Sequence, residues 1–243
     1  GHFIILPKDQ IIYLMDLEQD ALNYIFDQLK NKACLKQRVY RNLKEVFDKM
    51  RHEAKNIAET LDGMMANIDT SVKVEFEELG EFEFSIKFGG DALVFYMQSN
   101  VITFDKDFPV MQSAYVQAED ERKYFGHITI YNFLSDSIKY NRLEDPGYLI
   151  ARVLVNNENH FFLEGVGQMN FLFQDIDNNV LNKDWLRLII EKAMAASIDI
   201  DLIGPRYPDI RNISLHQKLK ENMAAVRGQK IGFQMSYENN IGG

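Results

Sequence analysis

The sequence has one cysteine, Cys34, among 243 residues, which excludes an internal disulfide and any fold that depends on one. Its longest apolar stretches are also short: residues 148–155 are interrupted by Arg152, whereas a membrane helix needs ~20 consecutive apolar residues. The start, residues 1–6, has neither the basic segment nor the apolar length of a signal peptide. We therefore expect a cytoplasmic protein that does not enter a membrane.

Signatures of catalysis and of cofactor binding are missing as well. Gly165 and Gly167 lack the third glycine of a dinucleotide-binding loop, because the required position holds Asn170, and no G-x-x-x-x-G-K-[ST] phosphate loop is present. His52 begins a zinc-protease pattern that fails four residues later, where Asn56 stands in place of the second histidine. We therefore expect no cofactor and no metal, and we lean toward a protein that is not an enzyme.

A partial calcium-loop pattern occurs later in the chain. Asp175, Asp177 and Asn179 match the first, third and fifth positions of such a loop. Val180 replaces the glycine that bends the loop, and Leu186 replaces the glutamate that binds calcium through two oxygens. The pattern therefore predicts a polar turn rather than a calcium site.

What the sequence does contain is typical of a globular protein. Hydrophobic residues make up 46% of it and charged residues 26%, with a formal net charge of -9, which excludes a disordered or collagen-like chain. The length suits one large domain or two small ones. The change of pattern along the chain predicts a helical hairpin at 1–69 and an α+β sheet domain at 70–243, or one continuous domain.

The first part of the chain has the apolar spacing of amphipathic helices. A helix is predicted over about 9–29, and a longer one over about 37–67, with 31–34 as the connection. At ~1.5 Å per residue the second helix would be about 45 Å long and would overhang its domain. The two helices are expected to pack as a long antiparallel pair. The apolar positions of the second helix are spaced by three and four residues: Val39, Leu43, Val46, Met50, Ala54, Ile57, Leu61, Met64 and Ile68.

Between Val72 and Phe173 the pattern changes to alternation of apolar and polar residues, which is typical of antiparallel strands with one wet face. Gly89 and Gly90 predict a tight hairpin turn, because glycines supply the positive φ angles that such a turn requires. We expect a meander of about seven to nine strands. The predicted strands are 72–77, 82–88, 92–98, 101–104, 126–133, 137–142, 148–155, 160–166 and 169–173.

The final part of the chain returns to helix. Asn182 is expected to cap a helix over about 183–197, and Ser214 with Gln217 forms a capping box for a further helix. Alternation over 231–237 then predicts a last strand that returns to the sheet. The fold class is therefore α+β, with the antiparallel meander between two helical regions.

Charge is distributed unevenly along the chain. Residues 30–55 contain nine basic and three acidic residues, a local charge of +6, so the rest of the chain carries -15. Such a stretch fits a docking site for a protein partner or a second copy, with nucleic acid as a less favoured alternative. It also fits pairing inside the chain, because five glutamates lie in the first predicted hairpin. These are Glu75, Glu77, Glu78, Glu81 and Glu83, and the candidate partner-binding residues are Arg38, Arg41, Lys44, Arg51 and Lys55.

Three ionisable residues fall within predicted apolar strands: Arg152 on one strand, and His160 and Glu164 on the next. The length of the turn decides their pairing, because a three-residue turn at 157–159 places Arg152 opposite Glu164 and other lengths do not. A buried arginine needs an ion pair, a ligand anion or exposure to solvent. Arg152, His160 and Glu164 are therefore candidate ligand-binding residues for a small anion such as a nucleotide.

These observations leave three hypotheses for function. The leading one is a non-catalytic cytoplasmic interaction or regulatory protein that associates with itself or a protein partner through the long N-terminal helices and the segregated charge. The second is an enzyme or sensor that binds a small anionic ligand at the sheet. The third is a protein that binds nucleic acid through residues 30–55.

Overall fold

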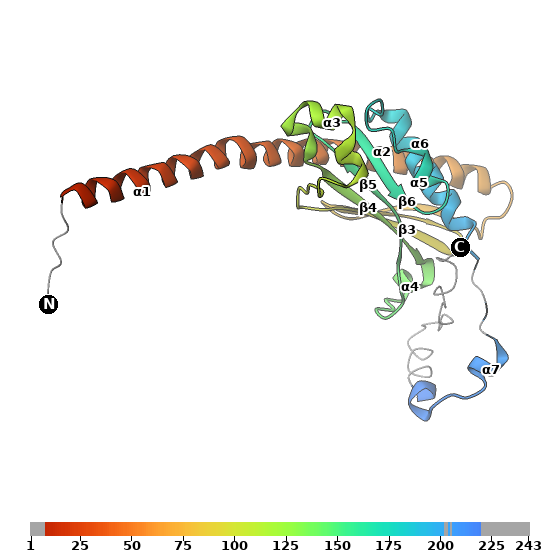
Figure 1. Ribbon diagram of the computed structural model, residues 1–243. Helices are drawn as coiled ribbons and strands as arrows, with labels where there is room; N and C mark the ends of the chain where they lie inside the picture. The colour runs from red at the N-terminus through yellow and green to blue at the C-terminus, as the bar shows by residue number, and fades with distance from the viewer. Residues whose placement is uncertain (1–7, 202–203, 205, 220–243) are drawn as a thin grey trace.

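The computed structural model describes residues 8–201, 204 and 206–219, and its N-terminal region is one continuous helix (Figure 1). The α-helix α1, Lys8–Gln28, runs through a π-helical turn, η1, Leu29–Ala33, into the α-helix α2, Cys34–Met65. The predicted antiparallel helix pair is therefore wrong. What projects from the body is α1, rather than an end of the second helix.

The predicted connection at 31–34 does not break the helix, because it contains no residue that stops one. Neither glycine nor proline occurs between residues 8 and 62. The backbone on both sides of η1 is helical, with φ -64° and ψ -42° at Gln28 and φ -63° and ψ -37° at Cys34. A π-helical turn holds more residues than an α-helical one, so η1 rotates the side chains of α1 about the helix axis relative to those of α2.

In the described residues the sheet has six strands in sequential order, all antiparallel. The predicted meander is therefore confirmed, and the predicted count of seven to nine strands is wrong. Gly89 and Gly90 form the two-residue turn between β2 and β3, where Gly89 alone of the two has a positive φ, +59°. The strands are β1 Val74–Gly80, β2 Glu83–Phe88, β3 Asp91–Met97, β4 Gly126–Leu134, β5 Tyr148–Val155 and β6 Phe161–Gly165.

Three predicted strands are wrong: 101–104, 137–142 and 169–173. The first pairs only through an isolated bridge between Ile102 and Phe125. The second overlaps a short helix, α4, Ser135–Lys139, and the third contains another, α5, Met169–Leu172. The predicted strand 169–173 is absent because Gly167, at φ +54°, turns the chain away after β6.

One face of the sheet is covered by α2 and by α6, Lys183–Ile198, and these elements form the main hydrophobic core. The buried side of α2 uses the predicted spacing as far as Ile57, with Leu43, Met50 and Ile57 almost completely enclosed. The last two predicted positions, Met64 and Ile68, are 61% and 78% exposed. Asn182 caps α6 as predicted, because its side chain accepts a hydrogen bond from a backbone N–H in the first turn at 2.9 Å. The core therefore joins the two long helices and the sheet.

The opposite face of the sheet is covered over β5 and β6 by residues 98–125, which include the short helix α3, Ala114–Ala118. Leu154 and Phe162 project to this side and pack in a second, smaller cluster with Phe125. Phe125 and Phe162 meet edge to face, with ring centroids 5.4 Å apart. Residues 98–125 are therefore anchored to this face of the sheet by apolar contacts.

The capping box at Ser214 is confirmed: its N–H donates to Gln217 Oε1 at 2.8 Å, and the Gln217 N–H donates to Ser214 Oγ at 3.1 Å. The predicted last strand, 231–237, lies outside the described residues. The division of the chain between 69 and 70 stays a prediction, and α2 belongs to the same core as the sheet. None of the helices in the described ranges combines the length and apolar character needed to span a membrane.

Candidate functional site

Arg152 and Glu164 lie opposite each other on β5 and β6, which is the arrangement that a three-residue turn predicts. The turn, Asn157–Asn159, is closed by the Asn156 N–H, which donates to the His160 carbonyl at 3.0 Å. Arg152 Nε donates to Glu164 Oε2 at 2.7 Å, and Arg152 Nη2 contacts the same oxygen. Arg152 therefore has its counter-charge within the chain.

This ion pair ends a polar row that crosses the sheet. Tyr96 of β3 lies opposite Thr129 of β4, Thr129 lies opposite Arg152, and Arg152 lies opposite Glu164. Beside the row, burial and then the charge of Arg152 hold the pKa of His127 below its usual value. Because Arg152 and Glu164 neutralise each other, the row offers an anionic ligand no unpaired arginine.

His160, the third candidate ligand-binding residue, belongs to a different cluster. It precedes Glu164 by four residues, which is about 13 Å of strand at ~3.3 Å per residue. Its ring stacks on Tyr115, with centroids 3.8 Å apart, and its Nδ1 donates to the Ile176 carbonyl at 2.7 Å. The structure therefore brings Arg152 together with Glu164 but places His160 elsewhere.

Tyr115 is the centre of a polar network that sequence patterns did not indicate. Its hydroxyl donates to Glu158 Oε2 at 2.7 Å and accepts from Asn156 Nδ2 at 2.9 Å. The Arg122 guanidinium lies 4.3 Å from the centre of the Tyr115 ring and pairs with Glu158. Burial, above all, raises the pKa of Tyr115 to about 12, and the hydrogen bond from Tyr115 is the main cause that lowers the pKa of Glu158. These partners indicate a structural network that holds residues 98–125 in place.

Three of the five candidate partner-binding residues are engaged inside the chain. Arg38 Nη2 pairs with Glu121 at 3.0 Å, and Lys44 Nζ pairs with Glu81 at 2.6 Å. Arg51 donates to the Glu81 backbone carbonyl at 2.7 Å. Both ion pairs are exposed, and such pairs contribute little to stability. Part of the basic stretch therefore faces the first hairpin and residues 98–125.

Arg41 and Lys55, the other two candidates, form no ion pair with any residue that the structure describes. The same holds for Lys30 and Lys32, which precede the body of the protein. All four side chains are exposed. Unpaired positive charge therefore remains at several points along the continuous helix.

The predicted polar turn before α6 is present. Asp175 Oδ1 accepts from the Asn178 N–H at 3.3 Å, and its Oδ2 accepts from Asn178 Nδ2 at 2.9 Å. Across the ranges that the structure describes, no three potential metal ligands of the His, Cys, Asp and Glu types come together.

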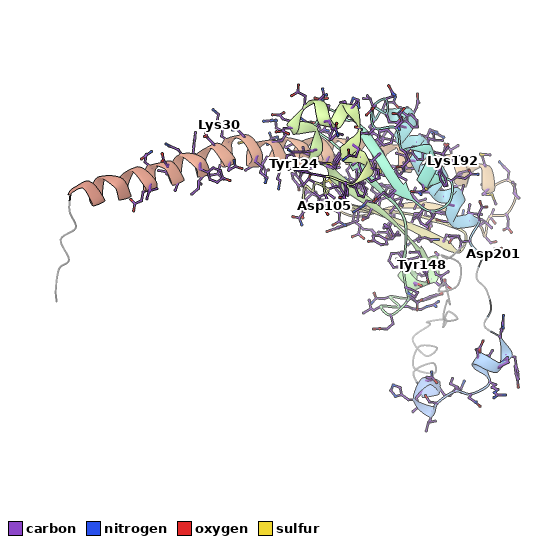
Figure 2. The ribbon with its side chains drawn as sticks, viewed as in Figure 1. Lys30, Asp105, Tyr124, Tyr148, Lys192 and Asp201 are labelled. Carbon is purple, nitrogen blue, oxygen red and sulfur yellow. The ribbon has the colours of Figure 1, made fainter. Side chains whose placement is uncertain are left out.

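The projecting helix, which we define as residues 17–33 of α1 and η1, carries an unpartnered apolar surface. Figure 2 shows it extending beyond the body, with Lys30 on its free part and Tyr124 where the helix reaches the body. A shallow groove of about 310 Å³ runs along it from Tyr24 to Lys36. Six large apolar side chains are exposed: Leu17 47%, Leu22 59%, Tyr24 65%, Ile25 52%, Phe26 61% and Leu29 57%.

Comparison with known proteins does not identify a family for this chain. No family model, no curated protein and no solved structure matches it. The choice among candidate surfaces therefore depends on the exposed side chains and charges described above, among which the projecting helix has the largest unpartnered apolar content.

Proposed function

We propose that this protein is a non-catalytic interaction protein that associates with a second copy of itself through the projecting helix. The observation that carries the proposal is the set of six large apolar side chains between Leu17 and Leu29, each 47% to 65% exposed. Apolar surface gathered on one element is costly in water and marks interaction sites. Burial between two chains removes that cost.

The projecting part of the chain is long enough to pair along its length with a second helix. The 21 residues of α1 and the 5 residues of η1 extend for about 39 Å at ~1.5 Å per residue. Helices in proteins gain most of their stability from packing of an apolar face. A helix that projects alone is therefore stabilised when it pairs with another.

A second copy is the occupant that fits the charge of the helix. The charged residues of 16–28 are all acidic and those of 30–42 are all basic, with Asp27 and Lys30 on either side of Leu29. Two copies of this surface satisfy each other's apolar and charged groups, as the self-complementary interfaces of two-fold symmetric dimers do. A different protein would have to carry both patterns independently.

The test is the mass of the full chain in solution, measured at micromolar concentration by light scattering after gel filtration. We expect twice the 28.3 kDa of one chain. The double variant Leu22→Ser and Phe26→Ser should be monomeric and folded, because both side chains are exposed and lie outside the core.

The matched control is the double variant Met64→Ser and Ile68→Ser, which removes two exposed apolar side chains near the other end of the same helix. This control should remain dimeric. A monomeric wild-type chain would contradict the proposal, and so would a control variant that dissociates as readily as the variant in the projecting helix.

A further inference from the structure

We propose that the two projecting helices pair antiparallel, with the two-fold axis of the dimer close to Leu29. This inference rests on the proposed self-association and adds the direction and register of the pair. It follows from the order of charges along the helix, which is an observation independent of the exposed apolar side chains.

The charge of the helix changes sign at Leu29. Residues 16–28 contain four acidic residues and no basic residue, whereas residues 30–42, a segment of the same length, contain five basic residues and no acidic residue. The acidic residues are Asp16, Glu18, Asp20 and Asp27, and the basic residues are Lys30, Lys32, Lys36, Arg38 and Arg41. The helix is therefore polarised about a single position.

Charges on both sides of Leu29 are available to a second copy. The side chains of Glu18, Asp20, Asp27, Lys30 and Arg41 are exposed, and none forms an ion pair with a described residue. Unpaired charges of one sign that gather on a surface create a field that selects the opposite sign. Each half of this helix therefore selects the other half of a second copy.

An antiparallel pair about Leu29 brings together residues whose numbers add up to about 58. Glu18 then lies near Arg41 of the second copy, within reach of these long side chains. A parallel pair in register would instead place acidic residues against acidic residues and basic against basic.

The groove on the projecting helix is centred near the same position. It runs from Tyr24 to Lys36, and Ile25, Leu29 and Ala33 line it. In the antiparallel arrangement Leu29 packs against its own copy, and Ile25 of each chain packs against Ala33 of the other. The apolar contacts and the charge pairs therefore agree on one register.

The salt dependence of dimerisation distinguishes the two orientations of the helices. Opposite charges attract in an antiparallel pair, like charges repel in a parallel pair, and salt weakens both effects. For the full chain, we expect the dimer Kd measured by sedimentation to weaken by about tenfold when the salt rises from about 0.05 M to about 0.5 M. A dimer that tightens as salt rises would overturn the antiparallel arrangement, and so would a Kd that does not change.

Direction is also tested with single cysteines in a Cys34→Ser background, joined by a short bifunctional maleimide. Ala21→Cys and Gln37→Cys occupy exposed positions whose numbers add up to 58. A mixture of these two variants should cross-link, whereas each variant alone should not. In both the antiparallel and the parallel pair, residue 28 of one chain lies close to residue 28 of the other. Gln28→Cys alone should therefore cross-link in either arrangement, and it serves as the control for the cross-linking reaction.

The outcomes separate the two proposals. A wild-type chain that is monomeric by light scattering contradicts self-association itself. A dimeric chain in which Ala21→Cys cross-links alone, or in which the mixture gives no cross-link while Gln28→Cys does, overturns only the antiparallel register. Cross-linking of the mixture alone supports both.

Discussion

Tyr115 belongs to a hydrogen-bond network that connects three segments distant in the sequence. It ties residues 98–125 to the β5–β6 turn through Glu158 and Asn156. The Asn156 backbone carbonyl in turn accepts a hydrogen bond from Asn42 of α2 at 3.0 Å. Loop, hairpin and helix therefore share one network, whose members support one another.

Replacing Tyr115 by phenylalanine should lower the free energy of unfolding by about 1–3 kcal/mol, because the partly buried amide of Asn156 and the carboxylate of Glu158 both lose a partner. Urea unfolding measures this change. Tyr96→Phe is the matched control, because Tyr96 is 39% exposed and its hydroxyl has no hydrogen bond to a described residue. Its effect should stay within about 0.5 kcal/mol. Equal losses in the two variants would contradict a special role for Tyr115.

His127 should make the protein less stable as the pH falls. Its pKa is lowered in the folded chain, first by burial and then by Arg152, so the unfolded chain takes up the proton first. The unfolding free energy should therefore decrease once the pH drops below ~6.5, the ordinary value for histidine. The His127→Asn variant should lose less stability between about pH 7.5 and about pH 5.5 than the wild-type chain does.

Urea unfolding at the two pH values measures this difference, and His52→Asn, on the exposed side of α2, controls for the loss of an imidazole. If His127→Asn and the wild-type chain lose the same stability, the burial of His127 does not account for the effect of pH.

Single residues were predictable only where a local pattern carried them. The caps at Asn182 and Ser214 depend on a few neighbouring residues, and both are found. The partner of Arg152 depends on a turn whose length the asparagine-rich stretch 156–159 does not fix. Tyr115 and Glu158, its hydrogen-bond partner, are 43 residues apart in the sequence, and no periodic pattern links them.

At the scale of elements, the close approach of β4 to α2 depends on Gly126. A Cβ atom at this position would lie 2.8 Å from Cδ2 of the buried Leu43 and 3.1 Å from its Cβ. Gly126→Ala should therefore lower the free energy of unfolding by about 1–3 kcal/mol, because the helix has to move or Leu43 has to change its conformation. Urea unfolding is again the measurement.

The matched control is Gly80→Ala at the end of β1, where an added Cβ would meet nothing within 4 Å. It should change the unfolding free energy by less than about 0.5 kcal/mol. A Gly126→Ala variant as stable as this control would show that α2 does not press against β4.

Periodicity predicted the elements that bury one face over several turns or strands, such as the buried stripe of α2 and the strand pairs of the meander. It failed where the run was short. Met169, Phe171 and Phe173 alternate like a strand, yet Phe171 is 79% exposed, because Gly167 has already turned the chain away. It also failed at 31–34, where a connection was predicted although nothing there stops a helix.

At the scale of the whole molecule, the α+β class followed from the order of the patterns, whereas the projection of α1 did not. The sequence shows that α1 has an apolar face, and folding this face back on a neighbouring helix was the simplest way to bury it. The structure leaves this face uncovered by any described residue, and the occupant that we propose for it is a second copy of the chain. A single sequence does not contain that information.

Deleting Asn31 should abolish the proposed dimer while leaving the body intact. Removal of one residue from η1 would rotate α1 by about 100° relative to α2. The groove residues before and after the turn, such as Ile25 and Ala33, would then face different directions, and a second copy would no longer contact both. Light scattering should show a monomer. Urea unfolding should show that the free energy of unfolding of the body is unchanged.

Asn31→Ala is the matched control for this deletion, because it alters the same exposed position without shortening the turn. It should remain dimeric. A deletion variant that dimerises as tightly as this control would contradict the role of η1 in orienting the two halves.

The unbroken passage from α2 into α1 has a mechanical consequence. One end of this rod is enclosed by the core around Phe47 and Met50, and the other end is free. It therefore acts as a lever: a tilt of about 5° within the core moves a tip that is about 39 Å away by about 3 Å. A pull on the free end is transmitted as torque to the packing of the body, so tension on such a dimer would be felt in both cores.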